Sequence, residues 1–277
     1  MLKRLNKTKE VKPVEEEKEM SFLDHLEELR WHIFRALAAI VVVAVAMYIM
    51  EAYVFRYVIF GPKNESFLTY QFFCSMSERL CFAPPDFEIV PREMGEQFFT
   101  SLKVSFWLGL VVAFPYVFYQ FWSFVKPGLH KSERQAATGV VFVCSALFLV
   151  GVLFGYFIIA PFAIRFLAGY SVGVDVINST SLSSYVGYLT MFTIPTGMVF
   201  ELPIVIYFLA KVGLVTPDFL RQYRRHAFVI ILVLAAVITP PDVVTQFLIG
   251  VPVFFLYEVS ILIAARMTKK REKELNS

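Results

Sequence analysis

The sequence predicts an all-α integral membrane protein with six transmembrane helices and both termini in the cytoplasm. Three observations carry this prediction: the composition, six long apolar runs, and the alternation of positive charge between the connections. Hydrophobic residues make up 57% of the 277 residues and charged residues only 18%, with a mean hydropathy of +0.62. A soluble domain contains about 25% charged residues. The composition therefore excludes an ordinary water-soluble domain.

Six apolar runs are the candidate spans, because a bilayer core of about 30 Å needs roughly 20 residues of helix. They cover residues 34–55, 98–121, 138–163, 188–211, 227–239 and 243–265. The fifth run is short: between His226 and Pro240 it offers about 14 residues, or about 21 Å of helix. Either this run is not a span, or it lies where the bilayer is thin.

Positive charge alternates along the chain, as it does when Lys and Arg stay on the cytoplasmic side. Four segments hold most of the Lys and Arg, with seven in 1–33, three in 122–137, four in 211–226 and five in 266–277. The alternate connections hold five, and none lies in the TPPD segment at 239–242. Both termini are therefore predicted to be cytoplasmic. That requires an even number of spans, so 227–239 and 243–265 are taken as two helices. The basic loops follow the topology rule and do not indicate nucleic-acid binding.

The chain begins and ends outside the membrane domain. Residues 1–20 are rich in Lys and Glu and lack an apolar signal-like core, which predicts a disordered cytoplasmic tail. Ser21 followed by Asp24 resembles a capping box. The next residues predict a short amphipathic helix that lies along the cytoplasmic interface and runs into the first span, with one face formed by Leu26, Leu29, Ile33 and Phe34. Residues 266–277 are interpreted as a basic cytoplasmic tail.

The longest connection, 56–97, is predicted to form an extracytoplasmic cap. Cys74 and Cys81 could form a disulfide in an oxidising compartment, but their spacing alone leaves the pairing open. Cys144, inside an apolar run, is expected to be a packing residue. The three Cys and four His show no metal-ligand spacing. No phosphate-binding loop or catalytic triad pattern appears, so we expect no metal, no cofactor and no enzymatic activity.

A short loop, FYQFWSFVKPGLHKSER at 118–134, separates two apolar runs. Its aromatic residues suit the headgroup region, and Pro127 and Gly128 predict a turn. It ends in Glu133 and Arg134, which indicates a recognition surface at the membrane boundary. The alternative is that Glu133 is a solvated loop charge paired with Arg134 or Lys131, and an exposed ion pair of this kind contributes little.

Two acids lie inside apolar runs. Glu201 is flanked by Pro195 and Pro203, which remove backbone donors and are expected to bend the helix. A carboxylate at that depth is costly unless it faces protein or water. It is therefore a candidate functional residue that lines a wet cavity, or else a buried acid that only orients helix packing. Glu258 lies nearer the cytoplasmic end of its run. We expect its side chain to reach the interface or a neighbouring Arg.

Four motifs together resemble the TatC family, the multispanning receptors of the twin-arginine protein translocase. They are HLEELR at 25–30, the 118–134 loop, FELP at 200–203 and TPPDVVTQ at 239–246. The resemblance covers residues 21–265 and implies six helices arranged as a concave, cupped wall in the bacterial inner membrane. It also implies export of folded proteins driven by the protonmotive force. The implied partners are the single-span TatA and TatB proteins, twin-arginine signal peptides and further copies of this chain.

The resemblance also assigns site residues. It implies that the residues binding the signal peptide are Glu28, Arg30, Pro115, Phe124 and Glu133. Two carboxylates suit two arginines, because a planar guanidinium meets a carboxylate bidentately where lysine cannot. Glu201 resembles the intramembrane acid of the family. Thr239 and Gln246 resemble contact points for a TatA or TatB helix, although Gln246 is equally explained as a residue at a helix start.

The rival function is an ion-coupled secondary transporter with Glu201 as its coupling site. The two halves show no repeat and no matching pair of broken spans, which disfavours a carrier. A purely structural scaffold is a third reading, and it predicts that Glu28 and Glu133 can be replaced freely. For the translocase reading, the short run 227–239 suggests a mechanism, because a span of about 21 Å should thin the bilayer around it.

Overall fold

The computed structural model describes residues 22–79, 81–84, 86–125, 137–170, 179–238 and 243–275, and most of these are helical. The predicted tail 1–20 and the capping residue Ser21 lie outside the described residues. The same holds for Glu133 and Thr239.

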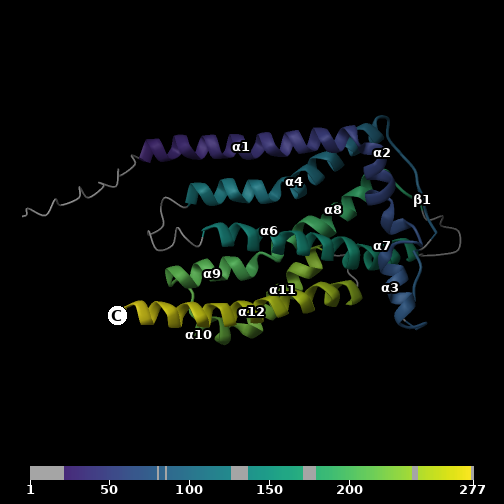
Figure 1. Ribbon diagram of the computed structural model, residues 1–277. Coiled ribbons are helices and arrows are strands. Elements are labelled where there is room, and N and C mark those ends of the chain that lie inside the picture. The colour runs from purple at the N-terminus through teal and green to yellow at the C-terminus, as the bar shows by residue number, and fades with distance from the viewer. Residues whose placement is uncertain are drawn as a thin grey trace, which may run out of the picture.

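The long helices run roughly along one axis (Figure 1). They are α1 (Phe22–Ile49), α4 (Glu96–Val125), α6 (Ala137–Phe154), α8 (Leu182–Val199) and α12 (Val243–Leu275). At the left of Figure 1 lie the start of α1 and the end of α12, and we call this the proximal end. The opposite, distal end holds α2 (Glu51–Tyr53), the π-helical turn η1 (Val54–Ile59), the short turn η2 (Gly61–Lys63) and α3 (Leu68–Met76).

Two of the long helices continue past a local irregularity. α6 passes through the π-helical turn η4 (Gly155–Ile159) into α7 (Ala160–Gly169). α8 breaks at Phe200 and Glu201 and continues as α9 (Leu202–Val212). Pro203 lies in the first turn of α9 and has no backbone N–H to donate, which explains the break at this point. The predicted bend next to Glu201 is therefore present.

Five helical stretches are long and apolar enough to cross a membrane, and each overlaps one of the predicted runs. They are His25–Ile49, Glu96–Val125, Gly139–Gly169, Leu182–Val212 and Thr245–Lys269. The remaining run forms α11 (Arg224–Ile238), which follows the short α10 (Pro217–Gln222). With 15 residues, α11 is about 22 Å long, shorter than a bilayer core. A sixth span therefore stays a prediction.

The N-terminal part of the first span differs from the expectation. α1 is one helix of 28 residues from Phe22 to Ile49. The amphipathic segment is therefore the first turns of the span itself and not a separate helix along the interface, because no residue between them breaks the helical hydrogen bonding. The basic segment 266–277 likewise begins as helix, since α12 continues to Leu275.

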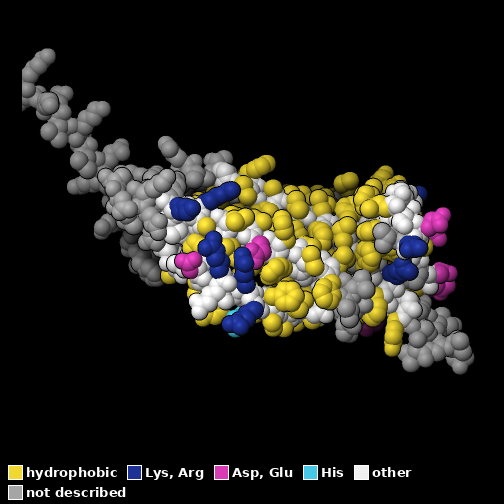
Figure 2. All heavy atoms as spheres, turned by 90° about the horizontal axis from the view of Figure 1, so that it is seen from below, with side chains coloured by type: hydrophobic (Ala, Val, Ile, Leu, Met, Phe, Trp, Pro, Cys, Tyr) yellow, Lys and Arg dark blue, Asp and Glu magenta, His cyan; other side chains and the backbone are white. Residues whose placement is uncertain are grey.

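Apolar side chains cover the middle of the surface. Figure 2 shows them across the centre of one face, with charged side chains gathered toward the two ends. Val42 and Phe142 are 69% and 75% exposed. A face of this kind is stable against lipid and unfavourable in water, which agrees with the predicted class of membrane protein.

The distal cap is held by an aromatic cluster and a short sheet. Buried Phe67, Tyr70 and Phe82 pack against residues of η4 and α7. Burial raises the pKa of Tyr70, whose hydroxyl donates to the Pro62 carbonyl at 2.7 Å. The strand β1 (Glu88–Ile89) pairs in parallel with β2 (Ser179–Thr180). The 56–97 segment is thus a packed part of the fold.

A disulfide joins Cys74 and Cys81 within this cap, the pairing that spacing alone left open. Cys144 is a free cysteine, fully buried in α6 as a packing residue. At the start of α4, the Glu96 carboxylate accepts from the backbone N–H of Arg92 at 2.5 Å and of Ser183 at 2.7 Å. Glu96 therefore fixes the cap to the first turn of α8.

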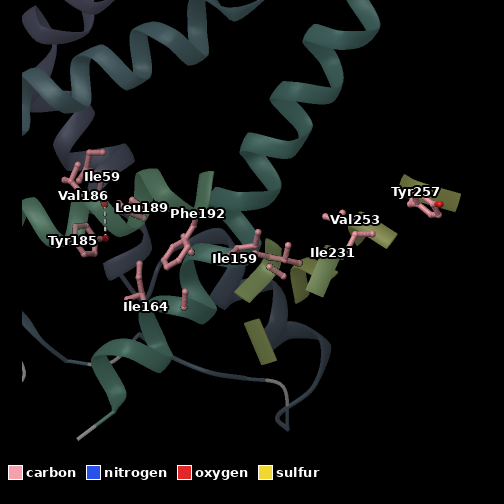
Figure 3. Packing of buried hydrophobic residues seen from close by; sticks show 14 of the residues in the cluster. Ile59, Ile159, Ile164, Tyr185, Val186, Leu189, Phe192, Ile231, Val253 and Tyr257 are labelled. Carbon is pink, nitrogen blue, oxygen red and sulfur yellow. Dashed lines mark hydrogen bonds between the residues drawn. The ribbon is translucent and has the colours of Figure 1, made fainter. Parts of the chain in front are cut away.

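The main core connects the long helices. Its buried residues extend from Ile59 and Tyr185 to Ile231 and Tyr257 (Figure 3). The Tyr185 hydroxyl donates to the Ile59 carbonyl at 3.0 Å, the dashed line in Figure 3. At the other end, Arg224 forms an ion pair with Glu258 at 2.6 Å. The expectation that Glu258 reaches a neighbouring Arg is confirmed.

Candidate functional site

The candidate site lies at the proximal end, where α1 and α4 run antiparallel (Figure 1). Gly109 of α4 permits their close approach: a Cβ atom there would lie 2.9 Å from the Ile40 carbonyl oxygen and from Ala44 Cβ. Only a residue without a side chain fits between the two backbones. This contact sets the distance between α1 and α4 three to four turns from the ends that carry the site.

Helical spacing places three polar side chains of α1 on the face toward α4. His25, Glu28 and His32 are separated by three and four residues, so they share one face. The Glu28 carboxylate lies 3.9 Å from His25 Nδ1 through Oε2 and 3.9 Å from His32 Nε2 through Oε1. Both distances exceed those of a hydrogen bond. Glu28 is therefore flanked by two imidazoles without being bonded to either.

α4 supplies the other wall of this cluster. The Phe124 ring stacks on His25, with centroids 4.4 Å apart and planes 15° apart. The buried Gln120 Oε1 lies 2.7 Å from His32 Nδ1. The imidazoles thereby connect the Glu28 face of α1 to two successive turns of α4.

The Glu28 carboxylate is in position to accept a ligand. Its side chain is 35% exposed, yet Oε2 is covered and has no hydrogen-bond partner among the described residues. A covered carboxylate oxygen without a donor is unfavourable, and an incoming cationic donor would relieve that cost. We therefore call His25, Glu28, His32, Gln120 and Phe124 the proximal cluster.

The proximal cluster contains two of the five residues expected to bind a signal peptide. Arg30 is exposed and lies two positions from Glu28, which on a helix turns it to another face. Pro115 lies within α4, nine residues before Phe124, and so about 13 Å away along the helix. Glu133 lies outside the described residues. The structure therefore brings Glu28 and Phe124 together, and Arg30 and Pro115 stand apart from them.

Three residues of the cluster were not assigned from the sequence. His25 and His32 could have been identified by their spacing of three and four residues from Glu28 on a helix. Gln120 had no such signal, because its contact with His32 joins residues 88 positions apart.

A second polar group lies deep between α6 and the α8–α9 break. The Glu201 carboxyl group faces the Cys144 thiol. Glu201 Oε1 and the Ser145 hydroxyl are buried without hydrogen-bond partners among the described residues. Unpaired polar groups in the interior of an apolar bundle are costly and frequently functional.

Gln246 is already occupied within the chain. Its side-chain amide donates to the Leu232 carbonyl of α11 at 3.1 Å, so it fastens the short α11 to α12. Within the described residues, no group of three His, Cys, Asp or Glu side chains is placed to hold a metal ion.

Comparisons with known proteins agree on one family. Residues 24–252 match the family model described as Sec-independent protein translocase protein (TatC). A TatC protein of Blattabacterium sp. subsp. Periplaneta americana is 35% identical over 263 residues, covering 92% of this chain and 99% of the relative. A TatC of Helicobacter pylori is 44% identical over 164 residues, covering 59% and 64%.

A solved structure gives the same result. The crystal structure described as the twin arginine translocase receptor TatC superposes with a TM-score of 0.68 at 31% identity. The match covers 88% of this chain and 99% of that one.

Proposed function

Because this chain belongs to the TatC family of Sec-independent protein translocase proteins, we propose that it binds twin-arginine signal peptides and directs the export of folded proteins. It is a multispan membrane protein and a translocase component, a transport subunit by family. The proposal adds the ligand, the site and the driving force, which is the protonmotive force across the bacterial inner membrane.

The observation that carries the proposal is the covered, unpartnered Oε2 of Glu28, which lies 3.9 Å from the His25 imidazole that stacks on Phe124. A guanidinium can meet a carboxylate with two parallel N–H groups while its plane stacks on an aromatic face. Lysine offers a point charge and cannot do both. One arginine of the signal would therefore pair with Glu28 and lie against Phe124.

The second arginine is assigned to Glu133, nine residues after Phe124 in sequence. Arg30 and Pro115 do not contact the arginine pair in this proposal, and each supports the site from outside the proximal cluster. Arg30 lies on the exposed rim of the same helix end. Pro115 removes one backbone donor within α4 and so affects the direction of the turns that carry Gln120 and Phe124.

The proposed topology places the proximal end in the cytoplasm, with both termini there and six spans in a cupped wall. α11 is then the fifth span, and the disulfide lies on the extracytoplasmic side. That orientation follows the charge distribution and places Cys74–Cys81 in an oxidising compartment. Glu201 would face the concave side, where a polar group of a partner or water could reach it.

Partners follow from the same proposal. Single-span TatA and TatB helices would contact the region of Thr239 and Gln246, and more than one copy of the chain would enter the complex. Since one N–H of the Gln246 amide donates to Leu232, its contribution to a partner helix would come through its carbonyl oxygen or its second N–H.

The test is crosslinking of a twin-arginine signal peptide to the full chain in membrane vesicles. Glu28→Ala and Glu133→Ala should lose crosslinking, whereas Glu27→Ala, which changes the exposed neighbouring acid, should retain it. A Lys-Lys peptide should crosslink poorly to the unchanged protein. Equal crosslinking of both peptides would reject the receptor proposal, and Glu201→Gln would then be tested for ion-coupled transport.

A further inference from the structure

A cavity of about 430 Å³ lies between α4, the α6–η4 helix and α8, with η1 at its distal end. Its wall is formed largely by apolar side chains, among them Trp107, Val111, Val152, Leu189 and Ile194. Two lining residues, Tyr57 and Leu153, are 63% and 52% exposed. The cavity therefore opens on the outer surface of the bundle, which faces lipid in a membrane.

Three polar side chains of the wall are hydrogen-bonded within the chain. Thr190 donates to the Val186 carbonyl at 2.8 Å and Thr193 to the Leu189 carbonyl at 2.9 Å. The Tyr156 hydroxyl donates to the Val58 carbonyl at 2.6 Å. These groups have no need of a polar ligand, so the cavity is suited to hydrocarbon.

One cation lies just beyond the distal end of the cavity. Lys103 lies one turn before Trp107 on α4, and its Nζ is 3.8 Å from the position a Cβ of Gly187 would take on α8. Gly187 in turn lies one turn before Thr190, so the ammonium group sits just beyond the cavity on the distal side. No acid contacts Lys103 within the described residues. An unpaired ammonium inside a span is costly and favours an anionic partner.

A second cation lies close by. The Arg56 guanidinium carbon is 5.5 Å from the ring centroid of Tyr57, a residue of the cavity wall. Each of these two positive groups therefore lies next to a helix that walls the apolar cavity. That combination matches a ligand with an anionic head and an apolar tail.

The cavity and the nearby cations together favour a lipid as the occupant, because an apolar interior suits an acyl chain and a cation suits a phosphate. A cavity of about 150 Å³ holds a benzene molecule, so the space here accommodates an extended acyl chain. We propose that the cavity binds one acyl chain of an anionic phospholipid, with its phosphate held by Lys103. The proposal requires a membrane location but not signal-peptide binding.

Native mass spectrometry of the full chain tests it. The purified protein is incubated with micelles containing phosphatidylglycerol or phosphatidylcholine with identical acyl chains, and the retained lipid is counted. We expect one retained phosphatidylglycerol, with phosphatidylcholine held more weakly. Lys103→Ala should lower phosphatidylglycerol retention about fivefold, and Lys103→Arg should preserve it. Arg79→Ala, which removes another exposed cation at the distal end, is the matched control and should change nothing.

The apolar half of the site needs its own variant. Leu153→Trp should fill the mouth and reduce retention of both lipids, with thermal unfolding measured alongside to verify folding. Wild-type retention in Lys103→Ala would overturn the headgroup assignment, and wild-type retention in Leu153→Trp would overturn the acyl-chain assignment. If Lys103→Ala instead loses a copurifying single-span protein and keeps its lipid, the lysine serves a protein partner and the lipid proposal is wrong.

Discussion

The imidazole of His25 lies flat against the ring of Phe124, with centroids 4.4 Å apart, while its Nδ1 points toward the Glu28 carboxylate at 3.9 Å. This is the position in which the proposed arginine would lie, stacked on the ring and facing the carboxylate. In the free protein, His25 therefore fills part of the proposed binding site.

Removing that imidazole should strengthen signal-peptide binding. His25→Ala should raise affinity about two- to tenfold, because stacked aromatic pairs contribute roughly 0.5–1.5 kcal/mol that the arginine would no longer have to displace. Fluorescence titration of a labelled twin-arginine peptide measures the change. Leu26→Ala, an exposed neighbour on the same helix, is the control. A fall in affinity would mean that His25 helps to hold the peptide.

Separating α1 from α4 should weaken signal-peptide binding without changing any residue of the proximal cluster. Gly109→Ala inserts a Cβ at 2.9 Å from the Ile40 carbonyl, and overpacking of this kind costs about 1–3 kcal/mol. We expect a lower unfolding temperature and weaker peptide binding together. Gly139→Ala, where a Cβ meets nothing within 4 Å, should affect neither. Binding at the wild-type level in the Gly109 variant would show that the proximal cluster does not depend on this helix contact.

Replacing Glu201 should raise thermal stability and slow transport. Glu201→Leu removes a carboxylate whose Oε1 has no partner among the described residues, so thermal stability in detergent should rise. Glu201→Gln keeps the shape and removes the charge. If the charge matters for transport, both variants should export a folded reporter at least tenfold more slowly. Normal export by Glu201→Gln would assign the residue to helix packing alone.

The disulfide should stabilise the cap and little else. Replacing Cys74 and Cys81 by Ser removes a short cross-link worth about 2.5 kcal/mol in the chain-entropy model. Limited proteolysis should then cut the 56–97 segment sooner. Both cysteines are exposed, so a reductant should have the same effect on the unchanged protein and none on the double variant. Cys144→Ser, which changes the buried free cysteine, should stay sensitive to reductant.

The length of α11 should matter for transport. The helix is 15 residues long and is tied to α12 by the Gln246–Leu232 hydrogen bond and the Arg224–Glu258 ion pair. Adding one turn of four apolar residues should impair export if a short span thins the bilayer. Four residues added instead between α9 and α10 provide the control for an insertion as such. Unchanged export with a longer α11 would reject the thinning mechanism.

Local chemistry in the sequence was sufficient to predict five of the six proposed spans, the break near Glu201 and the reach of Glu258 toward an arginine. Each of these depends on residues within a few turns of one another: apolar runs favour helix in lipid, Pro203 removes a donor, and a long acid near a span end finds a cation. The interfacial helix was wrong because amphipathic spacing alone does not distinguish a separate helix from the first turns of a span.

The tertiary structure alone decided which side chains meet. His32 contacts Gln120 across 88 positions, the Gln246 amide donates to α11, and Lys103 lies just beyond the distal end of a cavity walled by three helices. Such pairings depend on how the helices are shifted and rotated against one another. Close contacts, such as that of Gly109 with α1, determine these shifts and rotations. Hydrophobic periodicity predicts which face of a helix is buried, but many helix arrangements bury the same faces, so the partners across them follow only from the packed fold.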